Sequence, residues 1–299
     1  MIIKRIILKL KEREIQLGDR TLLCGILNVT PDSFSDGGKF SEPDRAFAHA
    51  VELEEAGADF IDVGAESTKP GSARVSEAEE LRRLVPVLKR LKGKLGIPVC
   101  VDTYKAAVAE KAIEHGAELI NDPSGLTWEP ALAKLVRDSG CGLILNHMRG
   151  TPETWGKLPP IHDPMGLVVK ELEACLHRAV HAGVEKSQVV IDPGLGFGKR
   201  KEQNFELLAR LDQLLRLDVP VMVGPSRKSF LSPSLTEKPS EFATAAAVTA
   251  AVLAGAHIVR VHDVSAMKHA VAIADAILRA RPQPQEEPVE KPNRPFQGR

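Results

Sequence analysis

The segment GILNVTPDSFSDGG at residues 25–38 joins the end of an apolar strand to a long polar loop. The apolar part, over residues 22–29, has the composition of a buried strand. The loop opens at Thr30-Pro31, closes at Gly37-Gly38 and carries two carboxylates and three hydroxyls. A strand-to-helix connection needs only about two to six residues, and longer loops dense in polar groups commonly bind ligands. We therefore predict a strand whose loop belongs to a binding site; a plain N-capping turn is the alternative.

The same unit of a short apolar strand, polar residues and an amphipathic helix repeats eight times along the chain. The predicted strands are 22–29, 60–64, 99–103, 119–122, 142–147, 189–192, 221–224 and 258–262. The predicted helices are 44–56, 76–92, 105–115, 130–139, 165–181, 204–217, 242–254 and 265–280. Eight such units in about 250 residues favour an α/β fold of the (β/α)8 TIM barrel type over an open doubly wound sheet. The first strand is also not followed by the Gly-x-Gly-x-x-Gly turn of a dinucleotide-binding sheet.

Two terminal segments lie outside this repeat. Residues 1–20 predict a short N-terminal β-hairpin, with arms at 6–10 and 14–17, that closes the N-terminal end of the barrel strands. Residues 281–299 are rich in proline and charge and predict a disordered C-terminal tail, because such a composition buries little apolar surface. We therefore predict a single barrel domain over residues 1–280.

The composition argues against several classes of function. The 299 residues suffice for one large domain. The chain has 40 Lys and Arg against 40 Asp and Glu, so any anion site is local and no overall basic surface attracts nucleic acid. Four scattered cysteines predict buried, reduced thiols. Because the sequence shows neither a signal peptide nor a run of roughly 18 apolar residues, we expect a soluble cytoplasmic protein that does not bind membranes.

Polar or charged residues end every predicted strand, at the face where barrel enzymes place their active sites. One group of acids and amides suits a planar heterocycle rich in hydrogen-bond donors: Asp102, Asn121 and Asp192. A second group of cations and hydroxyls suits phosphate oxygens: Thr68, Lys69, Ser226, Arg227, Lys228, Arg260 and His262. The alternative for each carboxylate is a structural salt bridge in the barrel mouth, and for Arg227 a surface ion pair.

The glycine-rich segment at residues 194–199 follows the sixth predicted strand. Its spacing differs from that of a phosphate-binding P-loop, because Pro193 stands where the first glycine belongs and Arg200 replaces the Ser or Thr. We interpret its glycines as allowing a tight turn and a close approach to a ligand, with Phe197 as one wall.

Eight segments of the chain together resemble the dihydropteroate synthase family. They occur in the family's order, and the resemblance covers about residues 15–280. The segments are 25–38, 62–71, 101–103, 120–122, 147–150, 192–199, 226–229 and 260–263.

The resemblance implies a transferase that condenses p-aminobenzoate with 6-hydroxymethyl-7,8-dihydropterin pyrophosphate, giving 7,8-dihydropteroate and pyrophosphate in folate biosynthesis. It implies a pterin site made of Asp102, Asn121, Asp192, Phe197, Gly224, Lys228 and Arg260. It implies that pyrophosphate is bound by Asn28, Thr68, Arg260 and His262, with Asn28 as a ligand of Mg²⁺. The aminobenzoate would lie near Phe34, Lys69, Pro70 and Ser229. The implied catalytic residues are Asp102, Asp192, Lys228, Arg260 and His262, and the implied assembly is a homodimer formed through the last helices.

Two residues depart from the family's usual pattern. Lys69 stands where Arg is usual, which keeps the charge but loses the bidentate fork. Asn146 stands where Met is common, which puts a polar group in a mostly apolar wall of the pterin site. These departures leave open a pterin-binding paralogue with altered or lost activity. A corrinoid-linked pterin methyltransferase domain is a further alternative, which the intact pyrophosphate set disfavours.

Overall fold

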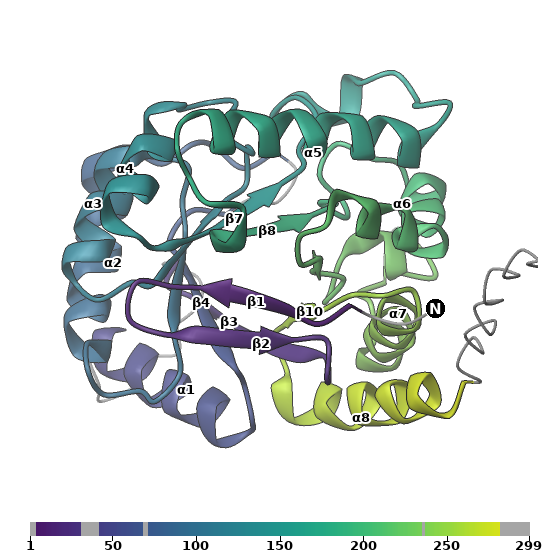
Figure 1. The fold of residues 1–299 in the computed structure, drawn as a ribbon, viewed down its shortest axis with the longest axis horizontal. Helices are drawn as coiled ribbons and strands as arrows, with labels where there is room; N and C mark the ends of the chain where they lie inside the picture. Colours follow the sequence, from purple (N-terminus) through teal and green to yellow (C-terminus); the bar gives the residue numbers. More distant parts are fainter. Residues whose placement is uncertain (1–3, 31–41, 68–70, 235–236, 282–299) are drawn as a thin grey trace, which may run out of the picture.

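The computed structural model describes residues 4–30, 42–67, 71–234 and 237–281, which form a barrel of parallel strands surrounded by helices (Figure 1). The strands follow the order β8-β7-β6-β5-β4-β3-β10-β9, and a parallel bridge between Ile191 and Val221 brings the two ends of this sheet together. The predicted (β/α)8 barrel is therefore confirmed. The predicted tail lies outside the described residues, apart from Arg281.

The barrel strands agree closely with the predicted ranges. They are β3 (Leu22–Asn28), β4 (Phe60–Gly64), β5 (Val99–Asp102), β6 (Leu119–Asp122), β7 (Gly142–Asn146), β8 (Val189–Asp192), β9 (Met222–Val223) and β10 (Ile258–Val261). The α-helices are α1 (Glu42–Glu55), α2 (Glu77–Leu91), α3 (Ala106–Glu114), α4 (Ala131–Ser139), α5 (Pro164–His181), α6 (Lys201–Ala209), α7 (Glu241–Leu253) and α8 (Val264–Ala280). Among these described helices, none combines the length and the apolar character needed to cross a membrane.

The predicted helix over residues 204–217 is wrong in its bounds. The helix α6 begins earlier, because the Gln203 side chain accepts a hydrogen bond from the Arg200 N–H at 2.8 Å and fixes the first turn. After α6 the chain continues as the 3-10 helix η4 (Leu211–Leu217). Its buried side chains follow a spacing of three residues, which matches the three-residue turn of a 3-10 helix: Leu211, Leu214 and Leu217.

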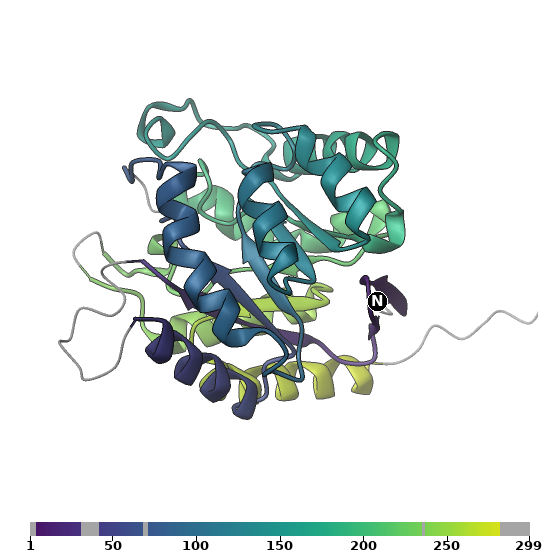
Figure 2. The ribbon, with the colours of Figure 1, turned by 90° about the vertical axis from the view of Figure 1, so that its left-hand side faces the viewer.

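The N-terminal hairpin closes one end of the barrel, as predicted. Strands β1 (Ile6–Lys9) and β2 (Glu14–Leu17) pair in antiparallel register, and Figure 2 shows this hairpin at the end of the barrel where β3 begins. Leu8 and Leu17 are completely buried against residues of the barrel strands. Burying each such leucine contributes about 1.5–3 kcal/mol, so the hairpin is an integral part of the barrel.

Side-chain alternation divides the barrel interior into an apolar floor and a polar layer. The floor packs against the hairpin and consists of Cys24, Phe60, Cys100, Leu119, Ile144, Val190, Met222 and Ile258. Successive side chains of a strand point to opposite faces, so residues two positions further along also face inward. Apart from Ile26, which follows Cys24 and is apolar, this second set forms the polar layer: Asp62, Asp102, Asn121, Asn146, Asp192, Gly224 and Arg260. All four cysteines are buried and free, as predicted.

Candidate active site

Arg260 on β10 connects two carboxylates of the polar layer, Asp62 and Asp102. Its Nε donates a hydrogen bond to Asp62 Oδ2, and its Nη2 donates to Asp102 Oδ2 at 3.2 Å. Asn121 Nδ2 donates to the same Asp62 oxygen at 3.0 Å. Asp62 is completely buried and therefore orients both Arg260 and Asn121. The sequence prediction gave Asp62 no role, although its place two residues after Phe60 of the floor would have identified it as an inward-facing carboxylate.

The charges in this group influence one another strongly. Burial and the charge of Asp62 raise the pKa of Asp102 to about 7, although Arg260 acts in the opposite direction. Burial alone would lower the pKa of Arg260, but Asp62 and Asp102 raise it above its ordinary value. The guanidinium therefore stays charged, while Asp102 is able to exchange a proton near neutral pH.

Asp192, Phe197 and Lys228 form a second part of the site. Asp192 ends β8 and accepts a hydrogen bond from the Gly194 N–H at 2.7 Å, and burial raises its pKa to about 6. Lys228 Nζ lies 4.1 Å from the centre of the Phe197 ring. Burial and the nearby Arg260 lower the pKa of Lys228 to about 8, against the attraction of Asp192. The structure therefore brings these three predicted pterin residues together.

His262 and Asn28 line a common cavity at the outer side of the barrel mouth. The cavity has a volume of about 480 Å³ and also contacts Arg227. His262 Nδ1 lies 2.9 Å from Ser226 Oγ, within hydrogen-bond distance. Arg227 makes an exposed ion pair with Glu241, with Nε 2.7 Å from Oε1. This is the surface ion pair that the sequence analysis gave as the alternative to phosphate binding.

The loop after β8 is packed against the end of β7 by close backbone contacts. Gly194 has a φ of +64°, and a Cβ atom placed on it would lie 1.9 Å from the carbonyl oxygen of His147. The buried Lys199 Nζ donates to the carbonyl oxygens of His147 at 3.1 Å and Gly194 at 2.7 Å. The close approach at Gly194 is therefore made to protein backbone, where the sequence interpretation placed a ligand.

Replacing Gly194 with alanine is expected to destabilise the protein by about 3 kcal/mol or more. The left-handed conformation costs about 1–2 kcal/mol for a residue with a Cβ, and the overlap with the His147 carbonyl adds the cost of shifting packed backbone. Gly93 is a matched control, because its φ is +67° and nothing lies within 4 Å of a Cβ there. Urea unfolding should show a much smaller loss for Gly93→Ala; equal losses would contradict the overlap.

Asn146 and His147 at the end of β7 take up different positions. Asn146 faces the barrel interior beside Asp192, and its Nδ2 donates to the Pro123 carbonyl at 2.9 Å. Its amide therefore links the loop after β6 to the site. His147 is buried, with Nε2 2.7 Å from Glu171 Oε2, and burial and the charge of Lys199 lower its pKa to about 4.

The remaining predicted residues have less direct placements. A Cβ atom on Gly224 would lie 3.7 Å from Arg260 Cβ, so this glycine faces the guanidinium side chain. Ser229 is exposed at the first residue of the short 3-10 helix Ser229–Leu231, next to Lys228 in the chain. The predicted residues Phe34, Thr68, Lys69 and Pro70 lie outside the described residues.

Comparisons with known proteins match nearly the whole barrel. The family described as pterin binding enzyme matches residues 24–262. Dihydropteroate synthase of Synechocystis sp. is 43% identical over 265 residues, which cover 88% of this chain and 92% of that protein. The Xanthomonas albilineans dihydropteroate synthase with 4-aminobenzoic acid is 39% identical, with a TM-score of 0.84 over 92% of this chain and 99% of that chain. The same enzyme in complex with 7,8-dihydropteroate is 38% identical, with a TM-score of 0.80 over 92% and 100%. The matched region thus runs from the first barrel strand to the residue after the last.

Proposed function

The chain belongs to the dihydropteroate synthase family of pterin binding enzymes, and from this membership we propose how its own residues carry out the family's reaction. The enzyme is a transferase that condenses p-aminobenzoate with 6-hydroxymethyl-7,8-dihydropterin pyrophosphate and releases 7,8-dihydropteroate and pyrophosphate. One observation carries the residue assignment. Arg260 contacts Asp102 and shares Asp62 with Asn121, so one barrel mouth holds acceptors for a ring and a cation for a diphosphate.

The pterin ring is held in the polar layer. The ring carries several N–H donors, and Asp102 and Asp192 supply acceptors for them while Asn121 supplies an amide. Lys228 and Phe197 form a cationic and an aromatic wall. The carboxylates also favour the positive charge that spreads from the methylene carbon into the ring as the bond to oxygen breaks.

The leaving diphosphate gains negative charge as that bond breaks. We assign Arg260 and His262 to this group, because a guanidinium and an imidazole stabilise the developing charge by hydrogen bonds and electrostatic attraction. The aniline nitrogen of p-aminobenzoate is a weak nucleophile, so a route in which the bond to oxygen breaks early suits it better than direct displacement. Exclusion of water protects the cationic carbon from hydrolysis.

Asn28 is suited to be a protein ligand of a magnesium ion that binds together with the diphosphate. Mg²⁺ prefers oxygen ligands and is commonly held by one or two protein groups together with substrate phosphates and water. In the described part of the chain, no three His, Cys, Asp or Glu residues gather as a self-sufficient metal site. The Asn28 amide oxygen beside the His262 cavity suits the shared arrangement. When bound, the ion supplies charge neutralisation for the leaving group.

The direct test of this proposal is a pyrophosphate-release assay. Product is expected only when both substrates and Mg²⁺ are present. Pterin binding measured by titration calorimetry without any turnover would instead favour the non-catalytic paralogue. In that event, Lys69→Arg combined with Asn146→Met should raise the rate sharply if these two departures are the cause.

Pterin affinity is expected to fall as the pH is lowered, because the ionised carboxylates accept hydrogen bonds from the ring. The fall should begin near pH 7, where Asp102 takes up a proton, and steepen below about pH 6, where Asp192 does. The effect on folding has the opposite sign. A raised carboxyl pKa means that stability is lost as the pH rises from the unfolded-state pKa of about 4 through the folded-state value. Calorimetric titrations from pH 5 to pH 8 would measure the affinity, and Asp192→Asn should remove the steeper component.

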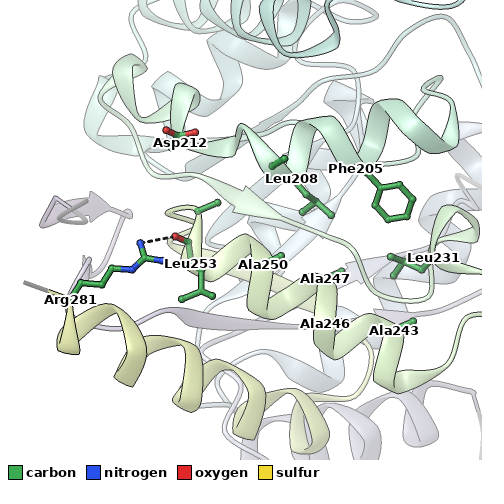
Figure 3. Close-up of a pocket in the computed structure, with 12 residues that line it drawn as sticks. Phe205, Leu208, Asp212, Leu231, Ala243, Ala246, Ala247, Ala250, Leu253 and Arg281 are labelled. Carbon is green, nitrogen blue, oxygen red and sulfur yellow. Dashed lines mark hydrogen bonds between the residues drawn. The ribbon is translucent and has the colours of Figure 1, made fainter.

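We also infer a homodimer through α6, α7 and α8. An apolar groove of about 780 Å³ lies between α6 and α7, and Figure 3 shows Phe205 and Leu208 across from the alanines of α7. Several large apolar side chains on these helices are exposed: Phe205, Phe242, Ile273 and Ile277. Exposed apolar groups on three neighbouring helices support an interface. The cytoplasmic location stays a prediction from the sequence.

Replacing Ala250 in the groove with arginine is expected to produce a monomer, because a charge would be buried at the interface. Light scattering should give twice the 32.4 kDa of the chain for the native protein and the single mass for the variant. Val180→Arg is the matched control, since Val180 is an exposed apolar residue on α5. A native protein that is monomeric at micromolar concentration would overturn this assembly.

A further inference from the structure

Ser226 and His262 are joined by two contacts at the ends of neighbouring strands. The Ser226 side chain is nearly fully buried, at 5% exposure. Its Oγ accepts a hydrogen bond from the backbone N–H of His262 at 3.2 Å and lies 2.9 Å from His262 Nδ1. One hydroxyl therefore contacts both the main chain and the ring of the same histidine. The sequence analysis grouped Ser226 with side chains that suit phosphate oxygens, whereas these contacts indicate that it acts through His262.

Only one of the two contacts has a fixed donor, which is the backbone N–H of His262. A backbone N–H can only donate, so Ser226 Oγ acts as the acceptor in that contact. The hydroxyl has a single proton of its own, and Nδ1 of His262 lies within hydrogen-bond distance of it. When the hydroxyl donates this proton in a hydrogen bond to Nδ1, Nδ1 is the acceptor and carries no proton. The neutral imidazole then has its proton on Nε2.

We propose that Ser226 is a positioning residue that fixes His262 as the Nε2–H tautomer, so that the ring offers a hydrogen-bond donor to the leaving diphosphate. This proposal rests on the function proposed above. The ring lines the same cavity as Asn28 and Arg227. A donor at Nε2 stabilises charge that develops on phosphate oxygens, whereas the other tautomer would turn a lone pair toward an anion.

The backbone around Ser226 is itself held in place. The next residue, Arg227, has a φ of +56°, which is uncommon for a residue other than glycine. Its N–H donates to Oγ1 of the fully buried Thr244 on α7 at 3.3 Å. The strained turn is thus tied to a helix, and it fixes the direction from which Ser226 reaches the histidine ring.

The tautomer can be measured without any turnover. Two-bond ¹H–¹⁵N correlation spectra distinguish Nε2–H from Nδ1–H imidazoles, and the spectrum of His262→Gln identifies the signal of His262 by its loss. We expect the Nε2–H pattern in the native protein and in Ser226→Thr, which keeps the hydroxyl. Ser226→Ala should give a mixture of tautomers. Ser232→Ala, which removes another buried hydroxyl, should leave the signal unchanged.

Steady-state rates provide the second arm of the test. Loss of one neutral hydrogen bond is expected to lower kcat about tenfold in Ser226→Ala, and Ser226→Thr should restore the rate. In the His262→Gln background, Ser226→Ala should have no further effect on kcat. A native His262 with its proton on Nδ1, or a tautomer that is unaffected by Ser226→Ala, would overturn the proposal. Because the spectra need no substrate, absence of synthase activity would be recognised separately.

Discussion

Replacing Arg260 with methionine is expected to lower kcat about 1,000-fold and the free energy of unfolding by about 3–5 kcal/mol. The rate falls because a preorganised cation is lost from the departing diphosphate, and losing one such donor costs roughly 100- to 1,000-fold. The stability falls because Asp62 is completely buried and depends on this guanidinium for charge compensation. Pyrophosphate release and urea unfolding measure the two effects.

A second substitution separates the two contributions of Arg260. Adding Asp62→Asn removes the uncompensated buried charge, so the double variant should regain most of the stability but none of the rate. Arg82→Met is the stability control, because Arg82 is 69% exposed and pairs with Glu79 on the surface of α2; its loss should change stability by no more than about 0.5 kcal/mol. Recovery of turnover in the double variant would show that Arg260 acts only as a structural partner of Asp62.

Replacing Asp192 with alanine is expected to weaken pterin binding by about 100-fold or more while leaving the fold intact. A hydrogen bond to a charged acceptor contributes about 1.5–3 kcal/mol, and a carboxylate with two oxygens can serve more than one ring donor. Within the protein, the Asp192 side chain accepts a hydrogen bond from the Gly194 N–H at 2.7 Å. Losing this bond should lower the free energy of unfolding only modestly. Calorimetric titration with the pterin measures the change.

The isosteric variant Asp192→Asn sharpens this test. The asparagine keeps an oxygen that accepts the hydrogen bond from the Gly194 N–H. Its amide NH₂ group, however, is a donor and cannot accept hydrogen bonds from the N–H groups of the pterin ring. We expect Asp192→Asn to bind the pterin nearly as poorly as Asp192→Ala, with an unchanged melting temperature. Unaltered pterin affinity in both variants would remove Asp192 from the binding site and with it the proposed orientation of the ring.

The fold could be predicted because the sequence patterns that specify its strands and helices are local. Alternating strands and amphipathic helices are set by neighbouring residues, and the predicted strand bounds agree to within two residues. The helix over 204–217 was predicted wrongly, because the three-residue spacing of Leu211, Leu214 and Leu217 was interpreted as part of an α-helix. The polar residues 201–203 also concealed where α6 begins.

The polar residues at the strand ends could be predicted one by one from the sequence, but the interactions between them could not. Asp62 and Arg260 are 198 residues apart in the chain, and they meet only because β4 and β10 both flank β3. The inward direction of Asp62 could therefore be predicted from its strand, but its pairing with Arg260 could not. Lys199 was judged against a phosphate-binding motif, whereas its role in holding the loop depends on carbonyl groups that converge in three dimensions.

The hairpin at the base of the barrel has a consequence for the order of events in each catalytic cycle. Because Leu8 and Leu17 close this end of the barrel, substrates and products enter and leave at the opposite end. The substrate that binds deeper must then bind before the second substrate, and the product must leave the active site before the next turnover begins. For a pterin in the polar layer and an aminobenzoate nearer the mouth, we expect ordered binding in steady-state kinetics, with the pterin first.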